Sequence, residues 1–355
     1  MQTIQANNYS IHFNQEAYQF LNEFIHQKEY SKLFVLTDSN TYTHCLPHFL
    51  AQVATEIEIE VIEIEAGEAH KTIDTCVQLW HSLTEMGGDR KSLLLNLGGG
   101  VISDLGGFVA STFKRGIDFI NIPTTLLAMV DASIGGKNGV DLGSLKNQVG
   151  VINVPKAVLV DPIYLETLAA NEMRSGLAEM LKHGLIFDQK YWEKLQNLNQ
   201  FTTEDLEQLI YESIVIKNAI VSQDPTENGL RKALNFGHTL GHAIESYFLE
   251  DDTKVTLLHG EAIAIGMILE SYLSLQKNLL KPEEYLQIKS TLQTLYSPVA
   301  FTGNDIENII DLLIHDKKNE HGTVQYALLN GIGSTKINQL IENEWIINAF
   351  ADYQS

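Results

Sequence analysis

The sequence predicts an α/β protein in two parts, with a nucleotide-binding type of domain over residues 1–162 and an all-helical domain over residues 163–355. The chain has 355 residues, which is enough for two domains with substantial cores. Strand-like and helix-like stretches alternate in the first part, as in βαβ units. Apolar residues recur at helical spacing in the second part. We therefore expect a functional site in the cleft between the two domains.

Four stretches of the first part have the composition of strands, and each leads into a turn or a helix-like run. They are KLFVLTD (32–38), EIEIEVIEIE (56–65), SLLLNLGGG (92–100) and DFINIPTT (118–125). Helix-like runs extend from Thr72 to Met86 and over VISDLGGFVASTF. From Lys137 to Pro162 the chain has glycines and short β-like pieces, which we interpret as the end of the first domain.

From about Ile163 onward the apolar residues have helical spacing in six successive segments, and we expect a last helix to end near Phe350. The six segments are GLAEMLKHGLI, DLEQLIYESIVIKNAIV, LNFGHTLGHAIESYF, GEAIAIGMILESYLSL, EEYLQIKSTLQTL and DIENIIDLLIHD. A short β-like piece, TVQYALL (323–329), interrupts the helical pattern.

Composition and charge limit the classes of partner. A hydrophobic content of 44% and a charged content of 19% are typical of a globular protein. Apolar runs end well before the roughly 18 residues of a membrane span, and the first residues do not have the pattern of an export signal. Cys45 and Cys76 form no CxxC pair, so we expect a reducing, cytoplasmic setting. The net charge of −21 argues against nucleic acid as a partner, but not against a small anion.

Glycines and acids at the ends of the predicted strands suggest a nucleotide site. Gly98, Gly99 and Gly100 follow one strand directly, although their spacing is not GxGxxG and a plain turn explains them equally well. Asp38 and Asn40 follow another strand and could hold ribose hydroxyls. As an isolated pair, they are more typical of a turn or a helix cap than of a ribose site.

Three histidines in apolar, glycine-rich segments indicate a metal or catalytic site. His238 and His242 are four residues apart and would project from one helix face, and His259 begins another helical run that could fold back onto that face. With Glu179, His238 and His259 would offer two nitrogens and one oxygen, a set that suits catalytic zinc and equally iron(II). Spacing leaves open whether His242 is a fourth ligand or an acid/base group. A surface ion pair of Glu179 with Lys182 is the alternative interpretation.

Several cations stand beside glycines and amides in four further motifs. The first motif has Asp131 and Lys137, and the second has Lys146 and Asn147. The third has Lys217, and the fourth has Arg231 and Asn235. Around a metal, such a set would bind an anion that carries phosphate or carboxylate. The alternative is a group of unrelated surface residues.

Read together, six ordered motifs resemble the 3-dehydroquinate synthase family of the sugar-phosphate cyclases. They are GGGVISDLGGFVAS, RGIDFINIPTTLLAMVDASIGGK, LKNQVG, MRSGLAEMLKHG, GLRKALNFGHTLGHAIE and LLHGEA, and the match runs from about Asp38 to about Gly333. The resemblance implies a Rossmann-like NAD-binding domain, a helical metal- and substrate-binding domain and a homodimer. It also implies conversion of 3-deoxy-D-arabino-heptulosonate 7-phosphate to 3-dehydroquinate and phosphate, with transient oxidation by NAD, elimination of phosphate, reduction and aldol closure.

The resemblance assigns a role to each matching position of this sequence. The implied ligands of zinc or cobalt are Glu179, His238 and His259, which makes His242 a hydrogen-bonding residue of the active site. The implied substrate contacts are Asp131, Lys137, Asn147, Lys182, Lys217, Arg231, Asn235 and His242, with Arg115 reaching the site of the partner subunit and either Lys317 or Lys318 adding a contact. The implied NAD contacts are Asp38, Asn40, Glu68, Lys71, Gly99, Gly100, Val101, Asp104, Thr124, Thr125, Lys137 and Lys146.

Two departures from the family pattern stand near these residues. Ser103 occupies a position where many members have glycine, and the loop from Glu250 to Leu257 is slightly longer than usual. The intact HGEA that follows this loop keeps His259 aligned.

Three other functions are weighed against this one. A cyclase that makes a valiolone-like or inosose product would differ in its substrate contacts. A metal- and NAD-dependent polyol dehydrogenase would have an aspartate among its ligands and fewer cations, and it would accumulate NADH. A metal-binding regulatory protein would not need the full set of acid/base and anion-binding residues.

Overall fold

The computed structural model describes residues 1–143, 145–196, 202–251, 253–313 and 324–355. The chain forms two compact units, Met1–Ala169 and Ala170–Ser355. None of the described helices is long and apolar enough to span a bilayer.

The end of the first unit lies beyond Pro162, where the sequence suggested the domain boundary. Asp161 caps a 3₁₀ helix, Pro162–Thr167, by accepting a hydrogen bond from the backbone of Ile163 at 3.1 Å. The hydroxyl of Tyr164 in this turn lies 3.0 Å from that of Tyr18 and shares a hydrogen bond with it. These contacts tie the turn to the first unit.

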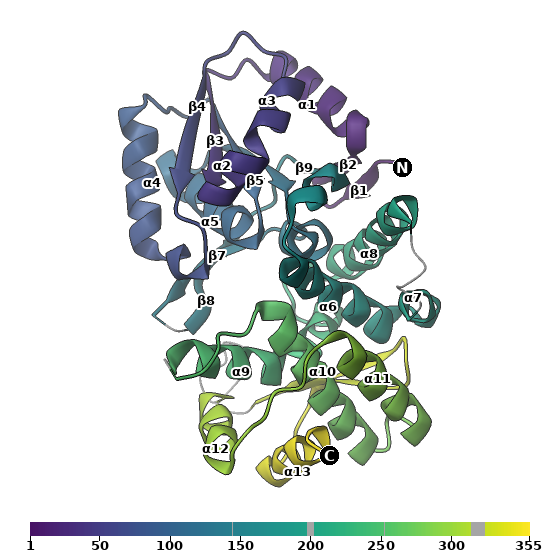
Figure 1. Ribbon diagram of the computed structural model, residues 1–355. Helices are drawn as coiled ribbons and strands as arrows, with labels where there is room; N and C mark the ends of the chain where they lie inside the picture. Colours follow the sequence, from purple (N-terminus) through teal and green to yellow (C-terminus); the bar gives the residue numbers. More distant parts are fainter. Residues whose placement is uncertain (144, 197–201, 252, 314–323) are drawn as a thin grey trace. The chain divides into compact units, whose positions relative to one another are not determined.

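The first unit is built on a seven-stranded sheet with the order β1-β2-β9-β6-β5-β3-β4 (Figure 1). Its strands are β1 (Ile4–Ala6), β2 (Tyr9–Phe13), β3 (Lys32–Asp38), β4 (Ile59–Ile64), β5 (Ser92–Gly98), β6 (Asp118–Pro123) and β9 (Ala157–Val160). All neighbours pair in parallel except β1, which is antiparallel to β2. The four predicted strands correspond to β3, β4, β5 and β6, so the α/β prediction is confirmed.

Both faces of the inner strands of this sheet are buried. Phe34 and Leu36 of β3 belong to a core that also includes residues of α4 and α5, and the alternate residues Leu33 and Val35 are equally buried. A strand buried on both faces has a continuous apolar sequence, as KLFVLTD does. The helices of this unit are α1 (Asn14–Lys28), α2 (Ser39–His44), α3 (Leu46–Gln52), α4 (Ile73–Glu85) and α5 (Gly100–Thr112).

The glycine-rich segment after β6 forms a β-hairpin. Strands β7 (Lys137–Leu142) and β8 (Leu145–Ile152) pair antiparallel, and β7 packs against α5. A Cβ at Gly107 of α5 would lie 1.9 Å from Oδ1 of Asn138, so only glycine allows this close approach. The hairpin brings Lys146 within 2.8 Å of Glu68, in the 3₁₀ turn Glu68–His70 that precedes α4.

The second unit is mainly helical and is arranged around α10. Its helices are α6 (Ala170–Phe187), α7 (Gln189–Leu195), α8 (Thr203–Gln223), α9 (His238–Glu250), α10 (His259–Gln276), α11 (Pro282–Leu295), α12 (Gly303–Leu312) and α13 (Asn343–Tyr353). Helix α10 packs against α6, α9, α11 and α13. A helix that is covered on all sides needs apolar residues around its whole circumference, which explains the run AIAIGMIL.

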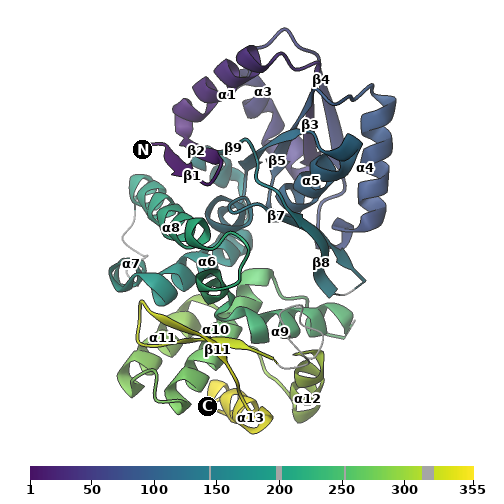
Figure 2. The same ribbon diagram turned by 180° about the vertical axis from the view of Figure 1, so that it is seen from behind.

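One prediction for the second unit needs correction, because this unit is not all-helical. Strands β10 (Tyr326–Leu329) and β11 (Thr335–Gln339) form an antiparallel hairpin (Figure 2). The pattern of residues 323–329 predicts the first strand, although residue 323 lies outside the described residues. Strand β10 is wholly buried against α10, where the backbone N–H of Leu329 donates to Ser274 Oγ at 3.0 Å.

Glycines set the distance between α9 and α10. A Cβ at Gly266 of α10 would lie 2.0 Å from the carbonyl oxygen of Gly237, and a Cβ at Gly241 of α9 would lie 2.8 Å from Ile263. Gly237 also has a φ of +77°, a left-handed conformation that favours glycine. The glycines of the GHTLGH motif and of α10 therefore let two histidine-bearing helices pack with their backbones almost in contact.

We expect Gly266→Ala to destabilise the protein, since the new methyl group would overlap the backbone of Gly237. Overpacking of this kind costs about 1–3 kcal/mol in a well-packed core. Chemical denaturation of the metal-free protein measures the loss. Gly303→Ala is the matched control, because a Cβ at this helical position meets nothing within 4 Å. Equal stabilities of the two variants would contradict the close crossing.

Candidate functional site

Glu179 is a fully buried carboxylate of the second unit. It lies on α6 and is 0% exposed. Lys182, one turn further along the same helix, is 1% exposed and forms an ion pair with it. This pair is therefore buried, and the alternative of a solvated surface pair does not hold. A buried charge is costly unless other charges compensate it, so the surroundings of Glu179 have to supply positive charge.

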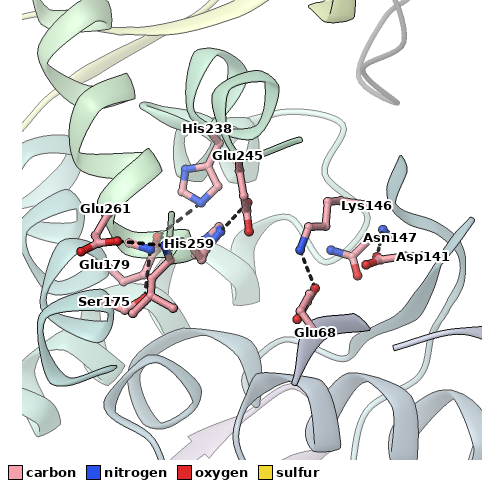
Figure 3. Close-up of polar contacts among 12 residues, drawn as sticks. Glu68, Asp141, Lys146, Asn147, Ser175, Glu179, His238, Glu245, His259 and Glu261 are labelled. Atoms are coloured by element: carbon pink, nitrogen blue, oxygen red, sulfur yellow. Dashed lines mark hydrogen bonds and ion pairs between the residues drawn. The ribbon is translucent and has the colours of Figure 1, made fainter. Parts of the chain in front are cut away.

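Two histidines reach the same oxygen of Glu179 from two other helices (Figure 3). His238 is the first residue of α9, and its Nε2 lies 3.3 Å from Oε1 of Glu179. His259 is the first residue of α10, and its Nε2 lies 3.7 Å from the same oxygen. The structure thus brings together the three residues that the sequence suggested as metal ligands.

The other nitrogen of each ring fixes its orientation. Nδ1 of His238 donates to the carbonyl oxygen of Phe236 at 3.1 Å, because a carbonyl can only accept. Nδ1 of His259 lies 3.1 Å from Oε2 of Glu245 and donates to that carboxylate. In the neutral rings the Nε2 atoms then carry lone pairs that point at a carboxylate oxygen. The two Nε2 atoms and the carboxylate oxygen of Glu179 therefore face one another with free lone pairs, and such atoms can act together as ligands of a cation.

The pKa shifts agree with this donor set. Burial would raise the pKa of Glu179, but the Lys182 ammonium and the His238 ring outweigh burial and hold the pKa well below its usual range. Burial and the nearby Lys182 lower the pKa of His238 to about 4, against the opposing effect of Glu179. For His259 the carboxylates of Glu245 and Glu179 outweigh burial and raise the pKa to about 10. At neutral pH His238 is therefore a neutral ligand, whereas His259 must lose a proton to bind a metal.

His242 completes the cluster of imidazoles. Its ring centroid lies 5.1 Å from that of His238 and 5.7 Å from that of His259. One ring nitrogen of each histidine can be chosen so that all three lie within 4.8 Å of one another. This distance is compatible with a fourth ligand and with an acid/base group beside the metal, so both interpretations of His242 stay open.

The donor geometry suits a tetrahedral metal. Two ligands that are each about 2.0–2.1 Å from zinc lie roughly 3.4 Å apart, and the Nε2–Oε1 distances of 3.3 and 3.7 Å bracket this value. Nitrogen and oxygen donors of this kind suit zinc, cobalt and iron(II). Glu179, His238 and His259 thus fit a divalent metal by chemistry and by spacing.

Short contacts between helices hold the three ligands in place. The backbone N–H of Gly260 donates to Ser175 Oγ on α6 at 2.9 Å, and a Cβ at Gly260 would lie 2.2 Å from the carbonyl oxygen of Ser175. Glu270 of α10 is 0% exposed and accepts hydrogen bonds from the backbone of Gly237 at 2.7 Å and of Leu240 at 3.1 Å. It therefore caps the first turn of α9, where His238 lies.

Two further cations of the second unit are buried. Lys217 on α8 is 5% exposed and Arg231 is 2% exposed. Asp224 orients Arg231 by accepting its backbone N–H at 3.0 Å, and Arg231 Nη1 donates to the carbonyl oxygen of Pro225 at 2.7 Å. Asn235 Nδ2 donates to Glu227 Oε1 at 2.7 Å. Cations that are buried in this way are not surface lysines, so the alternative of an unrelated surface group does not hold for them.

In the first unit, two ion pairs connect four of the residues suggested as NAD contacts. Lys71 Nζ lies 2.6 Å from Oδ2 of Asp104, and Lys146 Nζ lies 2.8 Å from Oε1 of Glu68. Burial would lower the pKa of Lys71, but Asp104 and Glu68 outweigh burial and raise it. These four side chains come from the 3₁₀ turn Glu68–His70 and the residue after it, from α5 and from β8, so the fold gathers residues that are far apart in sequence.

Asp141 anchors the hairpin beside these ion pairs. Its Oδ1 accepts the backbone N–H of Asn147 at 2.6 Å, and its own backbone N–H donates to the carbonyl oxygen of Lys71 at 2.9 Å. Burial raises the pKa of Asp141, partly offset by Lys71. Asn147 has a φ of +51°, so the carboxylate helps to hold a left-handed residue that the sequence suggested as a substrate contact.

The glycine turn after β5 leads directly into α5. Gly99 precedes the helix, and Gly100 and Val101 are its first residues. A Cβ at Gly99 would lie 2.9 Å from the side chain of Thr125. Ser103, the departure from the family pattern, is buried and donates its hydroxyl to the carbonyl oxygen of Gly99 at 3.1 Å. The hydroxyl thus stays within the helix and leaves the glycine turn intact.

The remaining candidates of the first unit lie at its strand ends and turns. Asp38 caps α2 by accepting the backbone N–H of Thr41 at 2.8 Å, so the helix-cap interpretation applies, and Asn40 is exposed on that helix. Thr124 and Thr125 directly follow β6. Lys137 starts β7 and is exposed.

Asp131 and Arg115 occupy unusual stretches of backbone. Asp131 lies in one turn of π-helix, Ala128–Ala132. Arg115 is exposed, and its φ of +70° follows a φ of +48° at Lys114. Left-handed backbone at two adjacent non-glycine residues is strained. Lys317 and Lys318 lie outside the described residues.

Comparison with known sequences identifies the family. A family model described as 3-dehydroquinate synthase N-terminal matches residues 61–175, and one described as 3-dehydroquinate synthase C-terminal matches residues 176–319. A 3-dehydroquinate synthase of Parabacteroides distasonis is 40% identical over 94% of this chain and 94% of its own length. One of Helicobacter pylori is 39% identical over 92% of this chain and 94% of its own length. The chain belongs to the 3-dehydroquinate synthase family.

Solved structures with the same fold include other sugar-phosphate cyclases. A 2-deoxy-scyllo-inosose synthase complexed with carbaglucose-6-phosphate, NAD+ and Co2+ has a TM-score of 0.85 at 24% identity, over 99% of this chain and 100% of that one. A 2-epi-5-epi-valiolone synthase from Streptomyces hygroscopicus with NAD+ and Zn2+ bound has a TM-score of 0.83 at 25% identity, over 100% of this chain and 99% of that one. An iron-containing alcohol dehydrogenase shares the fold with a TM-score of 0.70 at 15% identity, over 99% of each chain. 3-Dehydroquinate synthases thus share their fold with dehydrogenases.

Sequence reasoning missed four acidic residues that this family member uses to hold its candidate site. They are Asp141, Glu227, Glu245 and Glu270. A signal was present for two of them. Glu245 lies two helical turns after His238, and Glu270 interrupts the apolar run of α10. An acid inside an apolar helix is expected to have a buried partner.

Metal binding should release about one proton per ion at neutral pH, because His259 is protonated in the metal-free protein and His238 is not. While His259 stays protonated, the affinity for zinc should rise about tenfold per pH unit between the pKa of about 4 of His238 and that of about 10 of His259. Calorimetry in two buffers with different ionisation enthalpies measures the proton count. A heat of binding that is the same in both buffers would contradict the raised pKa of His259.

Lys182→Met should destabilise the metal-free protein by about 3–5 kcal/mol, because it removes a cation from a buried carboxylate. Zinc should restore most of the loss, since the ion supplies the missing positive charge. Thermal unfolding with and without zinc measures both effects. Lys194→Met is the control, because Lys194 pairs with Glu212 at 2.8 Å on the surface, where a pair contributes only about 0–1 kcal/mol. Equal losses in the two variants would argue against the buried pair.

Proposed function

We propose that this member of the 3-dehydroquinate synthase family converts 3-deoxy-D-arabino-heptulosonate 7-phosphate to 3-dehydroquinate and phosphate. The observation that carries the proposal is the convergence of Glu179, His238 and His259, which is the metal-binding half of such a reaction. The identity of 39–40% over more than nine-tenths of the chain to curated relatives of that name supports the choice of substrate.

Two groups from outside the chain belong to this proposal. When bound, a zinc or cobalt ion at Glu179, His238 and His259 would polarise hydroxyl groups of the substrate, and NAD+ would accept a hydride and return it. The two cyclases of the same fold are described with NAD+ and with Co2+ or Zn2+. Because the hydride comes back within one turnover, no NADH should accumulate.

The buried cations of the second unit are proposed to hold the two anionic ends of the substrate. Lys182, Lys217 and Arg231 lie in a protein whose net charge is −21, so their positive charge is a local feature. Ion pairs are stronger in a buried setting than at the surface, and the guanidinium of Arg231 suits bidentate binding of phosphate or carboxylate. Asn235 is proposed to add a hydrogen bond, and Asp131, Lys137 and Asn147 are proposed to contact the substrate from the first unit.

His242 is proposed to exchange a proton with the substrate. Its ring lies beside His238 and His259, which are occupied by metal binding in this scheme. An imidazole can act as a general acid or base toward a hydroxyl group of the substrate. The sugar phosphate is itself a base, which is consistent with a site that has several cations and whose carboxylates are engaged in pairs.

The first unit is proposed to bind NAD. The ion pairs of Lys71 and Lys146 border the turn from β7 to β8, and the glycine turn at Gly99 and Gly100 opens onto the start of α5. A helix N-terminus that follows a glycine turn offers backbone N–H groups to a pyrophosphate. The full proposed set is Asp38, Asn40, Glu68, Lys71, Gly99, Gly100, Val101, Asp104, Thr124, Thr125, Lys137 and Lys146.

A cytoplasmic homodimer is also part of the proposal. Arg115 is exposed on strained backbone, which would suit a residue that reaches the site of a partner subunit. Light scattering with size-exclusion chromatography measures the assembly. A monomer would leave Arg115 without that role.

The purified protein, supplied with the heptulosonate phosphate, NAD+ and zinc, should release phosphate without net formation of NADH. A hexose phosphate or a heptulose phosphate without a carboxylate should release much less, because one anionic end is missing. A phosphate-release assay and absorbance at the NADH maximum measure the two quantities. Accumulation of NADH would identify a dehydrogenase, and preference for a substrate without a carboxylate would identify a different cyclase.

A further inference from the structure

Glu245 is the acidic residue that contacts a proposed metal ligand through its outer nitrogen. It lies on α9, is 8% exposed, and places Oε2 at 3.1 Å from Nδ1 of His259 on α10 (Figure 3). His238 has a backbone carbonyl, that of Phe236, in the corresponding position. The two imidazoles are therefore oriented by acceptors of different kinds, one neutral and one anionic.

Chemistry distinguishes the Glu245 carboxylate from other possible partners of this ring. An ionised carboxylate has no proton to donate, so Nδ1 of His259 must carry the hydrogen. The neutral ring then has its lone pair on Nε2, which is the nitrogen that faces Glu179 at 3.7 Å. A hydrogen bond from Nδ1–H to a negatively charged carboxylate also makes the ring a stronger electron donor toward a cation bound at Nε2.

We propose that Glu245 is a positioning residue that fixes the tautomer and the orientation of His259 for metal binding. The proposal rests on the proposed metal role of His259. Glu245 would act on the metal through that ring, because it contacts Nδ1 and the metal-binding nitrogen is Nε2. Its position two helical turns after His238 places it on the same face of α9 as that ligand, which is why it can reach α10 at the site.

The competing explanation is purely structural, since the contact between Glu245 and His259 also joins α9 to α10. These two helices already cross closely at Gly237, Gly241 and Gly266, and Glu270 of α10 already caps α9. A structural role would therefore lower stability without affecting the metal. A positioning role would change metal affinity and ligand geometry.

Glu245→Gln separates the two explanations. Glutamine has the same shape, but its amide can donate as well as accept, so it allows the tautomer with hydrogen on Nε2, which cannot bind a metal. Glu250→Gln is the matched control, because it makes the same change at an exposed position on the same helix. The measurements are the zinc dissociation constant by competition with a chromophoric chelator, the visible spectrum of the Co2+-loaded protein, and thermal unfolding of the metal-free protein.

We expect Glu245→Gln to weaken zinc binding by about 10–100-fold, the usual effect of losing such a partner, and to alter the Co2+ spectrum. Glu250→Gln should match the unmodified protein in both. Unchanged affinity and spectrum in Glu245→Gln, with or without a lower melting temperature, would overturn the proposal in favour of the structural role.

Two further outcomes are also decisive. Failure of the unmodified protein to bind zinc would refute the metal site itself and this inference with it. Normal zinc binding by both the unmodified protein and Glu245→Gln is a different result. It would refute the role of Glu245 and leave the metal site in place. If Glu245→Gln does not fold, Glu245→Asp is measured in its place, because the shorter side chain keeps the charge but withdraws the acceptor, and the same two readouts apply.

Discussion

The burial of one negative charge organises the second unit. Glu179 is 0% exposed, and an isolated carboxylate in that position would be protonated or would destabilise the fold. The Lys182 ammonium is the main group that instead holds it in the ionised form, and against the effect of burial the pKa of Glu179 lies well below its usual range. Lys182 lies one turn along α6 from Glu179, and His238 and His259 are the first residues of α9 and α10, so three helices meet at this charge.

Close backbone packing makes this arrangement possible. A histidine side chain has a short reach. His238 and His259 therefore contact Glu179 only if α9 packs closely on α10 and α10 packs closely on α6. Glycines provide both contacts, Gly237 with Gly266 at the first and Gly260 at Ser175 at the second. Glycine usually weakens a helix, but these glycines are required because a side chain at their positions would push the helices that carry the ligands apart. Stability of the crossing and geometry of the site depend on the same few atoms.

Local patterns in the sequence predict much of this molecule. The strand over 32–38 is found with the same ends, because a strand buried on both faces must be continuously apolar. Glu179, His238 and His259 are predicted as a group from their residue types. The hairpin strand Thr335–Gln339 is not predicted, since its residues are half-exposed and polar. Glu245 and Glu270 are missed because each acts on a neighbouring helix, and spacing within one helix does not reveal partners on another.

The electrostatics of the metal-free site explain how it can be formed before a metal binds. Lys182 and a protonated His259 provide the positive charge that the buried Glu179 requires when no ion is bound. A divalent cation at Glu179, His238 and His259 would take the place of the proton on His259, and the hydrogen bonds to Phe236 and Glu245 would orient the two rings for it. Preorganised ligands lose little conformational entropy on binding, which favours affinity. The retained ammonium of Lys182 beside the ion adds to the local positive charge, and this charge is what an anionic substrate requires in a protein that is strongly acidic elsewhere.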